Sequence, residues 1–63
     1  MFKGQDTVYH PRLGYGEVIN VKIKKLKNYE EEITYEIYFN GKIRKIRDTS
    51  IDYKDIKLVE RSL

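Results

Sequence analysis

The 63-residue chain has no cysteine and no tryptophan, and it contains only one proline and one histidine. Without cysteine, a disulfide framework, a thiolate metal site and a cysteine nucleophile are all excluded. Small secreted domains usually carry disulfides, so this absence favours a cytoplasmic protein. No apolar run approaches the roughly 18 residues that cross a membrane, and the first residues lead straight into polar sequence. We therefore expect neither a membrane span nor a signal peptide.

Residue types that carry catalysis are equally scarce. His10 is the only histidine, and the two serines are Ser50, in a polar stretch, and Ser62, near the end. Nucleophilic catalysis needs a nucleophile, a base and an orienting group, and a zinc site needs about four convergent ligands. The acidic residues form short runs without the spacing of a calcium loop. The sequence thus predicts a protein that is not an enzyme and holds neither a metal ion nor a cofactor.

The chain is rich in charge and in tyrosine. Charged residues make up 37% and hydrophobic residues 40% of it, and it includes six tyrosines. The apolar residues fall in patterned runs, which is typical of a folded domain rather than of a disordered tail. A chain this short buries only about 60% of its unfolded surface, so we expect one compact domain over residues 1–63. The net charge of +3 favours anionic partners.

Alternating apolar and polar residues predict five short strands. They cover residues 7–10, 17–24, 33–39, 42–47 and 56–59. The 33–39 run is the clearest, because its odd-numbered residues are all apolar. In the 17–24 run, Ile19, Val21 and Ile23 alternate with polar residues, while Val18 breaks the alternation and indicates a bend near the start of the strand.

Turn signals separate these runs. Gly14 and Gly16 indicate a tight turn with at least one residue at positive φ. Asn40-Gly41 is a strong two-residue hairpin signal. Residues 25–32 are charged and predict a loop. Residues 48–53 predict a polar turn with one turn of 3₁₀ helix, capped by Asp48 or Ser50.

Two further features concern the strand ends. Ile43 and Ile46 differ in parity, so the 42–47 strand twists, bulges or ends between them. Residues 60–63 are expected to be a frayed tail. Five short strands in about 60 residues bury one face best by curling the sheet. The predicted fold is therefore all-β, a small five-stranded SH3-like or Tudor-like partly open barrel.

Basic residues suggest one kind of binding site. Lys22 and Lys24 share a face of one strand, Lys42 and Arg44 share a face of another, and Tyr38 lies on the strand between them. Lysine and arginine around an aromatic ring can hold nucleic acid through phosphate contacts and base stacking. Lysine on an edge strand also serves simply as protection against aggregation.

A second kind of site is an exposed strand edge to which a partner adds an extended segment. Exposed tyrosines would anchor such a partner, or would simply cap the ends of the small core. The residues predicted to contact a protein partner are Tyr9, His10, Arg12, Tyr15 and Tyr53. For His10 the alternative is a purely structural position at a strand end before Pro11.

Residues 8–18 read V-Y-H-P-R-L-G-Y-G-E-V. The pattern V-x-H-P-x-x-G-x-G-x-V resembles the opening of two related groups of small barrels. One is the RNA-polymerase-interacting domain of CarD-type regulators and transcription-repair coupling factors. The other is the C-terminal Tudor-like domain of UvrD/PcrA-type helicases. Residues 2–6 and the hairpin at 37–46 extend the resemblance more loosely.

The resemblance implies a bacterial protein-binding module that docks on transcription or DNA-repair machinery, often on the β subunit of RNA polymerase through exposed strand edges. These residues include neither the DNA-contacting domain of CarD-type regulators nor a helicase body. The remaining alternatives are a direct nucleic-acid-binding barrel, a small phage or plasmid regulator of another host enzyme, and a domain excised from a longer protein.

Overall fold

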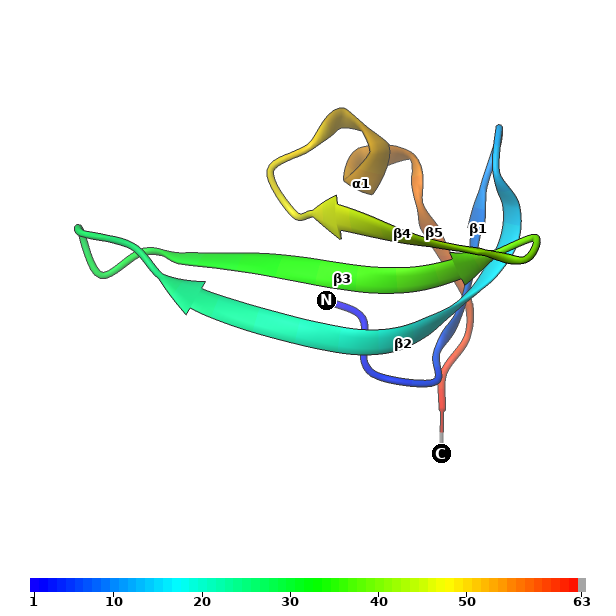
Figure 1. Cartoon of the computed structure of the whole chain (residues 1–63), viewed down its shortest axis with the longest axis horizontal. Coiled ribbons are helices and arrows are strands. Elements are labelled where there is room, and N and C mark those ends of the chain that lie inside the picture. The colour runs from blue at the N-terminus through cyan, green and yellow to red at the C-terminus, as the bar shows by residue number, and fades with distance from the viewer. Residues whose placement is uncertain (63) are drawn as a thin grey trace.

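The structure is a computed structural model that describes residues 1–62. The elements are β1 (Thr7–His10), β2 (Gly14–Lys25), β3 (Glu31–Phe39), β4 (Lys42–Arg47), α1 (Ile51–Asp55) and β5 (Lys57–Glu60). The five strands form one antiparallel sheet in the order β4-β3-β2-β1-β5 (Figure 1). Within the described residues β4 and β5 remain edges, so the sheet curves without closing into a barrel. The prediction of a small, all-β, five-stranded and partly open fold is confirmed.

The only helix of the described part is α1, with a single turn. The Ser50 side chain caps it by accepting a hydrogen bond from the Tyr53 N–H at 3.3 Å. The predicted turn is therefore present, as α-helix rather than 3₁₀ helix, and Ser50 rather than Asp48 is the cap. No helix within residues 1–62 is both long enough and apolar enough to cross a bilayer.

The three glycines near the turns have different roles. Gly41 has φ of 84° and Asn40 has φ of 45°, which makes the β3–β4 connection the predicted two-residue hairpin. Gly14 has φ of 82° and forms the predicted turn before β2. Gly16 instead lies within β2, where a Cβ atom would stand 2.6 Å from the Phe39 ring. It is required for close packing, so its assignment to the turn was wrong.

The predicted break at Val18 is a register shift in β2. The pairing of β2 with β3 slips between Val18 and Asn20. Val18 is fully buried, whereas Ile19 and Ile23 are 44% and 54% exposed. The expected alternation was therefore wrong for Ile19, because the irregularity brings Val18 into the core and turns Ile19 outward, whereas Val21 is half-buried against the core as predicted.

The two isoleucines of β4 lie on opposite faces. Ile43 pairs with Tyr38 and is exposed, while Ile46 pairs with Tyr35 and is buried. The β3–β4 register runs from Phe39–Lys42 to Thr34–Arg47 without a shift, so their difference in parity needs no bulge.

The core lies on the inner face of the sheet, under β1, α1 and the N-terminal segment. Tyr53 of α1 stacks on Tyr35 with ring centroids 5.5 Å apart, and Phe2 packs edge-on against Tyr35 at 5.4 Å. The Phe2 N–H donates to the Tyr35 hydroxyl at 3.3 Å. The buried hydrophobic residues are Phe2, Val8, Val18, Tyr35, Ile37, Phe39, Ile46 and Ile56.

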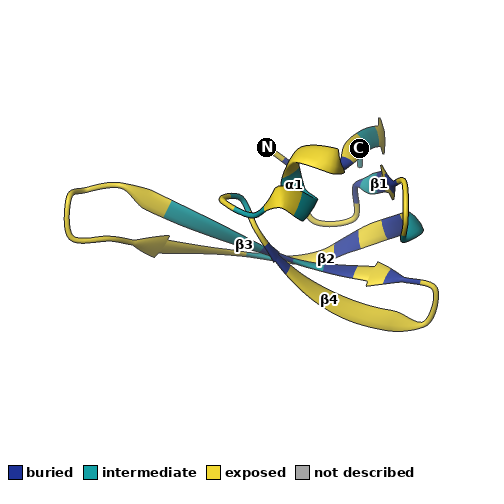
Figure 2. Ribbon diagram, turned by 90° about the horizontal axis from the view of Figure 1, so that it is seen from above, coloured by how far each residue is buried: buried dark blue, intermediate teal, exposed yellow. Residues whose placement is uncertain are grey.

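The far part of the β2–β3 hairpin, residues 22–34, extends well beyond this core, and we call it the arm (Figure 1). Both strands are longer than predicted, so the charged loop shrinks to residues 26–30. Figure 2 shows that burial is concentrated where other segments cover the sheet, while the arm is mostly exposed. Toward the C-terminal end of the chain, Glu60 belongs to β5 and the Ser62 N–H is hydrogen-bonded, so most of the predicted tail is ordered. Leu63 lies outside the described residues.

Candidate functional site

The residues that carry the family resemblance form a turn capped by a histidine. The His10 Nδ1 atom accepts hydrogen bonds from the Arg12 N–H at 3.1 Å and the Leu13 N–H at 3.3 Å. Pro11, between His10 and Arg12, has no N–H that needs a partner. Gly14 then takes the positive φ that leads the chain into β2. The His-Pro-x-x-Gly pattern therefore has a structural explanation, and the fully buried His10 ring cannot reach a partner directly.

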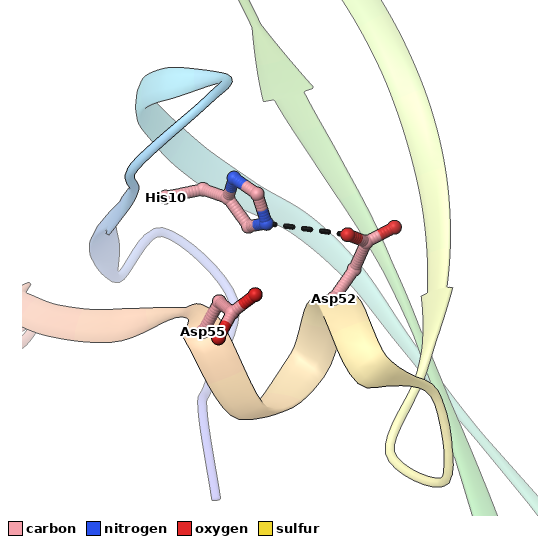
Figure 3. A group of neighbouring side chains, drawn as sticks. All are labelled: His10, Asp52 and Asp55. Atoms are coloured by element: carbon pink, nitrogen blue, oxygen red, sulfur yellow. Dashed lines mark ion pairs between the residues drawn. The ribbon is translucent and has the colours of Figure 1, made fainter.

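The same contacts determine which nitrogen of His10 carries the proton. Because Nδ1 accepts two hydrogen bonds, the proton of the neutral ring is on Nε2. Nε2 is 3.3 Å from Asp52 Oδ1 and is buried without a well-aligned hydrogen-bond partner (Figure 3). His10, Asp52 and Asp55 offer ligand atoms within 4.8 Å of one another. A metal-bound histidine uses one nitrogen lone pair and donates from the other nitrogen, so this tautomer is unsuited to a metal ion.

Arg12 joins this turn to α1 at the surface. Its Nη2 atom donates to Asp52 Oδ1 at 2.8 Å, and the side chain is otherwise exposed. An exposed ion pair of this kind contributes about 0–1 kcal/mol, so it orients Arg12 more than it stabilises the fold.

Asp6 is a structural anchor that the sequence did not reveal. Its carboxylate is fully buried and accepts hydrogen bonds from the Lys3 N–H at 2.8 Å and the Ser62 N–H at 2.7 Å. The backbone hydrogen bond from Ser62, followed by that from Lys3, lowers the pKa of Asp6 below its ordinary value. Asp6 thus joins the two ends of the chain. Nothing in the sequence distinguishes it from nine other acidic residues, because its partners are backbone groups.

The predicted protein-contacting residues divide into two groups. Tyr9 and Tyr15 pair across β1 and β2 on the outer face, with ring centroids 4.9 Å apart. Arg12 is also exposed. His10 is buried, and Tyr53 is half-buried, packed on the core against Phe2 and Tyr35. The first group is the more accessible to a partner.

The predicted basic residues also fail to form one patch. Lys42 and Arg44 pair with Phe39 and Ile37, so their side chains leave the sheet on its inner face. Lys22 and Tyr38 lie on the outer face. Lys24 pairs with Glu32 in the ladder, and Lys22 Nζ is 3.5 Å from Glu36 Oε1.

Acidic neighbours therefore offset the two lysines of the arm. The Asn20 side chain donates to Glu36 at 2.9 Å. That hydrogen bond is the main reason that the pKa of Glu36 lies below its ordinary value, and Lys22 lowers it further. The carboxylate thus stays ionised beside Lys22, which weakens the attraction of this part of the arm for phosphate.

The outer edge of β4 is free. Phe39 and Lys42 flank the two-residue turn and form a hydrogen-bonded pair. In an antiparallel ladder such pairs recur at every second residue. The bond from the Asp48 N–H to the Ile33 carbonyl, at 2.8 Å, continues that series. The intervening residues Ile43 and Lys45 must then direct their N–H and C=O groups away from β3.

A groove of about 580 Å³ lies along this part of the molecule. It touches Lys45, Ile46 and Arg47 of β4, together with Ser50 and Asp52 near α1. Its other lining residues, on β2 and β3, include the apolar Ile23 as well as charged side chains such as Glu32 and Glu36. The end of β4 therefore adjoins a hollow with both polar and apolar walls.

No family model, curated protein or solved structure matches this chain. The fold and these surfaces define a small all-β protein with an open sheet, an exposed basic edge at β4 and an exposed tyrosine face.

Proposed function

We propose that this protein is a non-catalytic binding module that docks on transcription or DNA-repair machinery by adding a strand of its partner to the free edge of β4. The observation that supports this is the unpaired edge: within the described residues, no strand pairs with the outward N–H and C=O groups of Ile43 and Lys45. The resemblance at residues 8–18 points to bacterial RNA polymerase as the partner to test first.

The side chains of β4 indicate which strand would fit. Four of its six residues are basic, and the exposed Ile43 is 58% accessible among them. Added strands gain affinity from main-chain hydrogen bonds and specificity from side chains at alternate positions. The partner strand therefore carries acidic residues, with an apolar residue opposite Ile43. The charges speed encounter more than they add affinity.

Retention of purified bacterial RNA polymerase on the immobilised protein at physiological salt tests the proposal. In Lys45→Pro the ring replaces an N–H that points to solvent, so the β3–β4 ladder stays intact while strand addition is blocked. We expect about ten-fold weaker retention, equivalent to one lost hydrogen bond of about 1.4 kcal/mol.

Lys45→Ala is the matched control, because it removes the same charge but keeps the N–H. It should retain most of the polymerase, and circular dichroism should show that both variants are folded. Failure of the wild-type protein to retain polymerase would overturn this choice of partner. Equal losses in the two variants would show that the charge, not the edge, is responsible.

A second function, nucleic-acid binding, is favoured by one hollow. Arg12, Lys42 and Arg44 line a depression of about 230 Å³ together with Leu13, Phe39 and Asn40. Within residues 1–62 Lys42 and Arg44 take part in no ion pair, while Arg12 is paired with Asp52, so the first two are the cations that suit a phosphate group.

Titration with single- and double-stranded DNA over a range of salt tests this alternative. Binding should weaken with salt by about one logarithmic unit per phosphate contact. Lys42→Ala and Arg44→Ala should each reduce that slope by about one unit. Lys22→Ala and Lys24→Ala are the controls, because acidic residues already face both lysines. A flat salt response would exclude this function.

A further inference from the structure

A groove between two exposed tyrosines lies on the outer face, and no residue of β4 lines it. It has a volume of about 380 Å³ and is lined by Tyr15, Tyr38, Thr7, Gly16, Glu17 and Asn40. Tyr15 and Tyr38 are 66% and 48% exposed. The Tyr38 hydroxyl is 3.9 Å from the point where a Cβ would stand on Gly41, so its ring leans toward the hairpin turn. Thr7 and Gly16 form part of the floor between the two tyrosines.

Among the described residues that line this groove, Glu17 alone is charged, although the protein is positive overall. Glu17 pairs with Thr7 in one neighbouring strand and with Tyr38 in the other. Within residues 1–62 its carboxylate takes part in no ion pair. A free carboxylate beside exposed aromatic rings repels phosphate and attracts a cation.

We infer that this groove binds an arginine side chain of a protein partner, with the guanidinium stacked on the rings of Tyr15 and Tyr38 and paired with Glu17. A planar guanidinium suits both contacts at once, because it stacks on aromatic faces and also donates two parallel hydrogen bonds to a carboxylate. The inference adds a second contact to the proposed protein-binding function, on which it rests, and it places that contact on the outer face at β1, β2 and β3, inward of the β4 edge.

The probe is the peptide acetyl-Gly-Arg-Gly-amide, followed through the backbone amide signals of the labelled protein by nuclear magnetic resonance. We expect saturable shifts that are largest at Tyr15, Glu17 and Tyr38. The matched control peptide carries citrulline, which has the shape of arginine without its charge. It should bind about three-fold to five-fold more weakly, the factor expected for an exposed cation–π contact of about 0.5–1 kcal/mol.

Variants separate the two contacts. Glu17→Gln and Tyr38→Ala should each weaken binding of the arginine peptide by about three-fold to five-fold. Tyr29→Ala is the control, because Tyr29 is 97% exposed at the tip of the arm and lies outside the groove. It should bind as the wild type does.

Three results would overturn the inference. They are equal affinity for the citrulline peptide, undiminished binding by Glu17→Gln, and shifts at Tyr15 and Tyr38 produced by a single-stranded oligonucleotide but not by the arginine peptide. The Lys45→Pro variant makes this test independent of the proposed function. It should bind the arginine peptide normally whether or not the polymerase is retained, since Lys45 lies outside the groove.

Discussion

The two ends of the β2–β3 hairpin carry similar apolar alternation but have different environments. Near the turn into β4, Ile37 is fully buried and Phe39 is 3% exposed. At the far end, Ile23 is 54% exposed, although it pairs with Ile33 on the same face of the sheet. Alternation therefore identifies a face of a strand, whereas burial depends on what covers that face.

The cover at the buried end comes from segments distant in sequence. Phe2, Val8 and Ile56 close over the inner face, and the polar anchors Asp6 and His10 hold the chain there. The arm has no such cover and is held by its ladder, in which Lys24 pairs with Glu32. Cross-strand pairs of this kind contribute about 0.2–1 kcal/mol each, much less than a packed core.

Truncating one isoleucine at each end tests this comparison most strongly. Ile37→Ala should lower the free energy of unfolding by about 2–5 kcal/mol, because it leaves a cavity in the core. Ile23→Ala removes the same atoms from an exposed position and should cost within about 0.5 kcal/mol. Urea denaturation measures both values. Similar losses would show that the arm contributes to a core that the structure does not show.

A smaller effect is expected from crowding the buried end. In Gly16→Ala the new methyl group would stand 2.6 Å from the Phe39 ring, so the ring or the strand must move. We expect a loss of about 1–3 kcal/mol, typical of overpacking. Gly4→Ala is the control, since nothing lies within 4 Å of its added Cβ. Thermal unfolding that changes equally in the two variants would contradict the close approach.

Substitutions of His10 test which atom of this buried side chain stabilises the turn. In His10→Asn the amide oxygen takes the place of Nδ1 and can still accept from Arg12 and Leu13. In His10→Gln the amide lies near the place of Nε2, and the cap is lost at a cost of about 0.5–2 kcal/mol. We therefore expect the asparagine variant to be the more stable, although glutamine is closer to histidine in size. The opposite order in denaturant unfolding would mean that packing, not capping, determines the choice of histidine.

The smallest expected change in stability concerns the two carboxylates with lowered pKa, and it is seen as the pH is lowered. A carboxyl whose pKa is lower in the folded protein stabilises it above the unfolded pKa, and this contribution is lost as the pH falls through the folded value. The ordinary values are 3.8 for Asp6 and 4.5 for Glu36, so stability should decline below about pH 4.5.

The two carboxylates should differ in how much they contribute to stability. Two backbone N–H groups donate to the buried Asp6, whereas one exposed side chain donates to Glu36. Asp6→Asn should flatten the decline of stability with acid more than Glu36→Gln does. Urea midpoints measured between pH 2 and pH 7 check this order. An unchanged acid profile in Asp6→Asn would show that Asp6 is not ionised in its buried position.

The local features were readable from the sequence because their causes are local. Asn40-Gly41 demands a two-residue hairpin, Gly14 provides a positive φ, and Ser50 caps the turn that follows β4. The five strands and the open all-β class follow from alternation and chain length in the same way. Tyr9 and Tyr15 were predicted to be exposed and are so, but their pairing across β1 and β2 was not predicted.

Contacts between distant residues decided the rest. Val18 enters the core in place of Ile19 because the register of β2 slips against β3. The broken alternation at Val18 indicated an irregularity there but not which of the two residues it would bury. Tyr53 is half-buried against the core because α1 folds back over Tyr35. The basic residues are separated because cross-strand register puts Arg44 on the face of Ile37. The sequence by itself determined the hairpins, the strands and the absence of catalytic residue types. Only the tertiary structure decided which tyrosines and cations reach solvent together, because that depends on pairing and cover rather than on local preference.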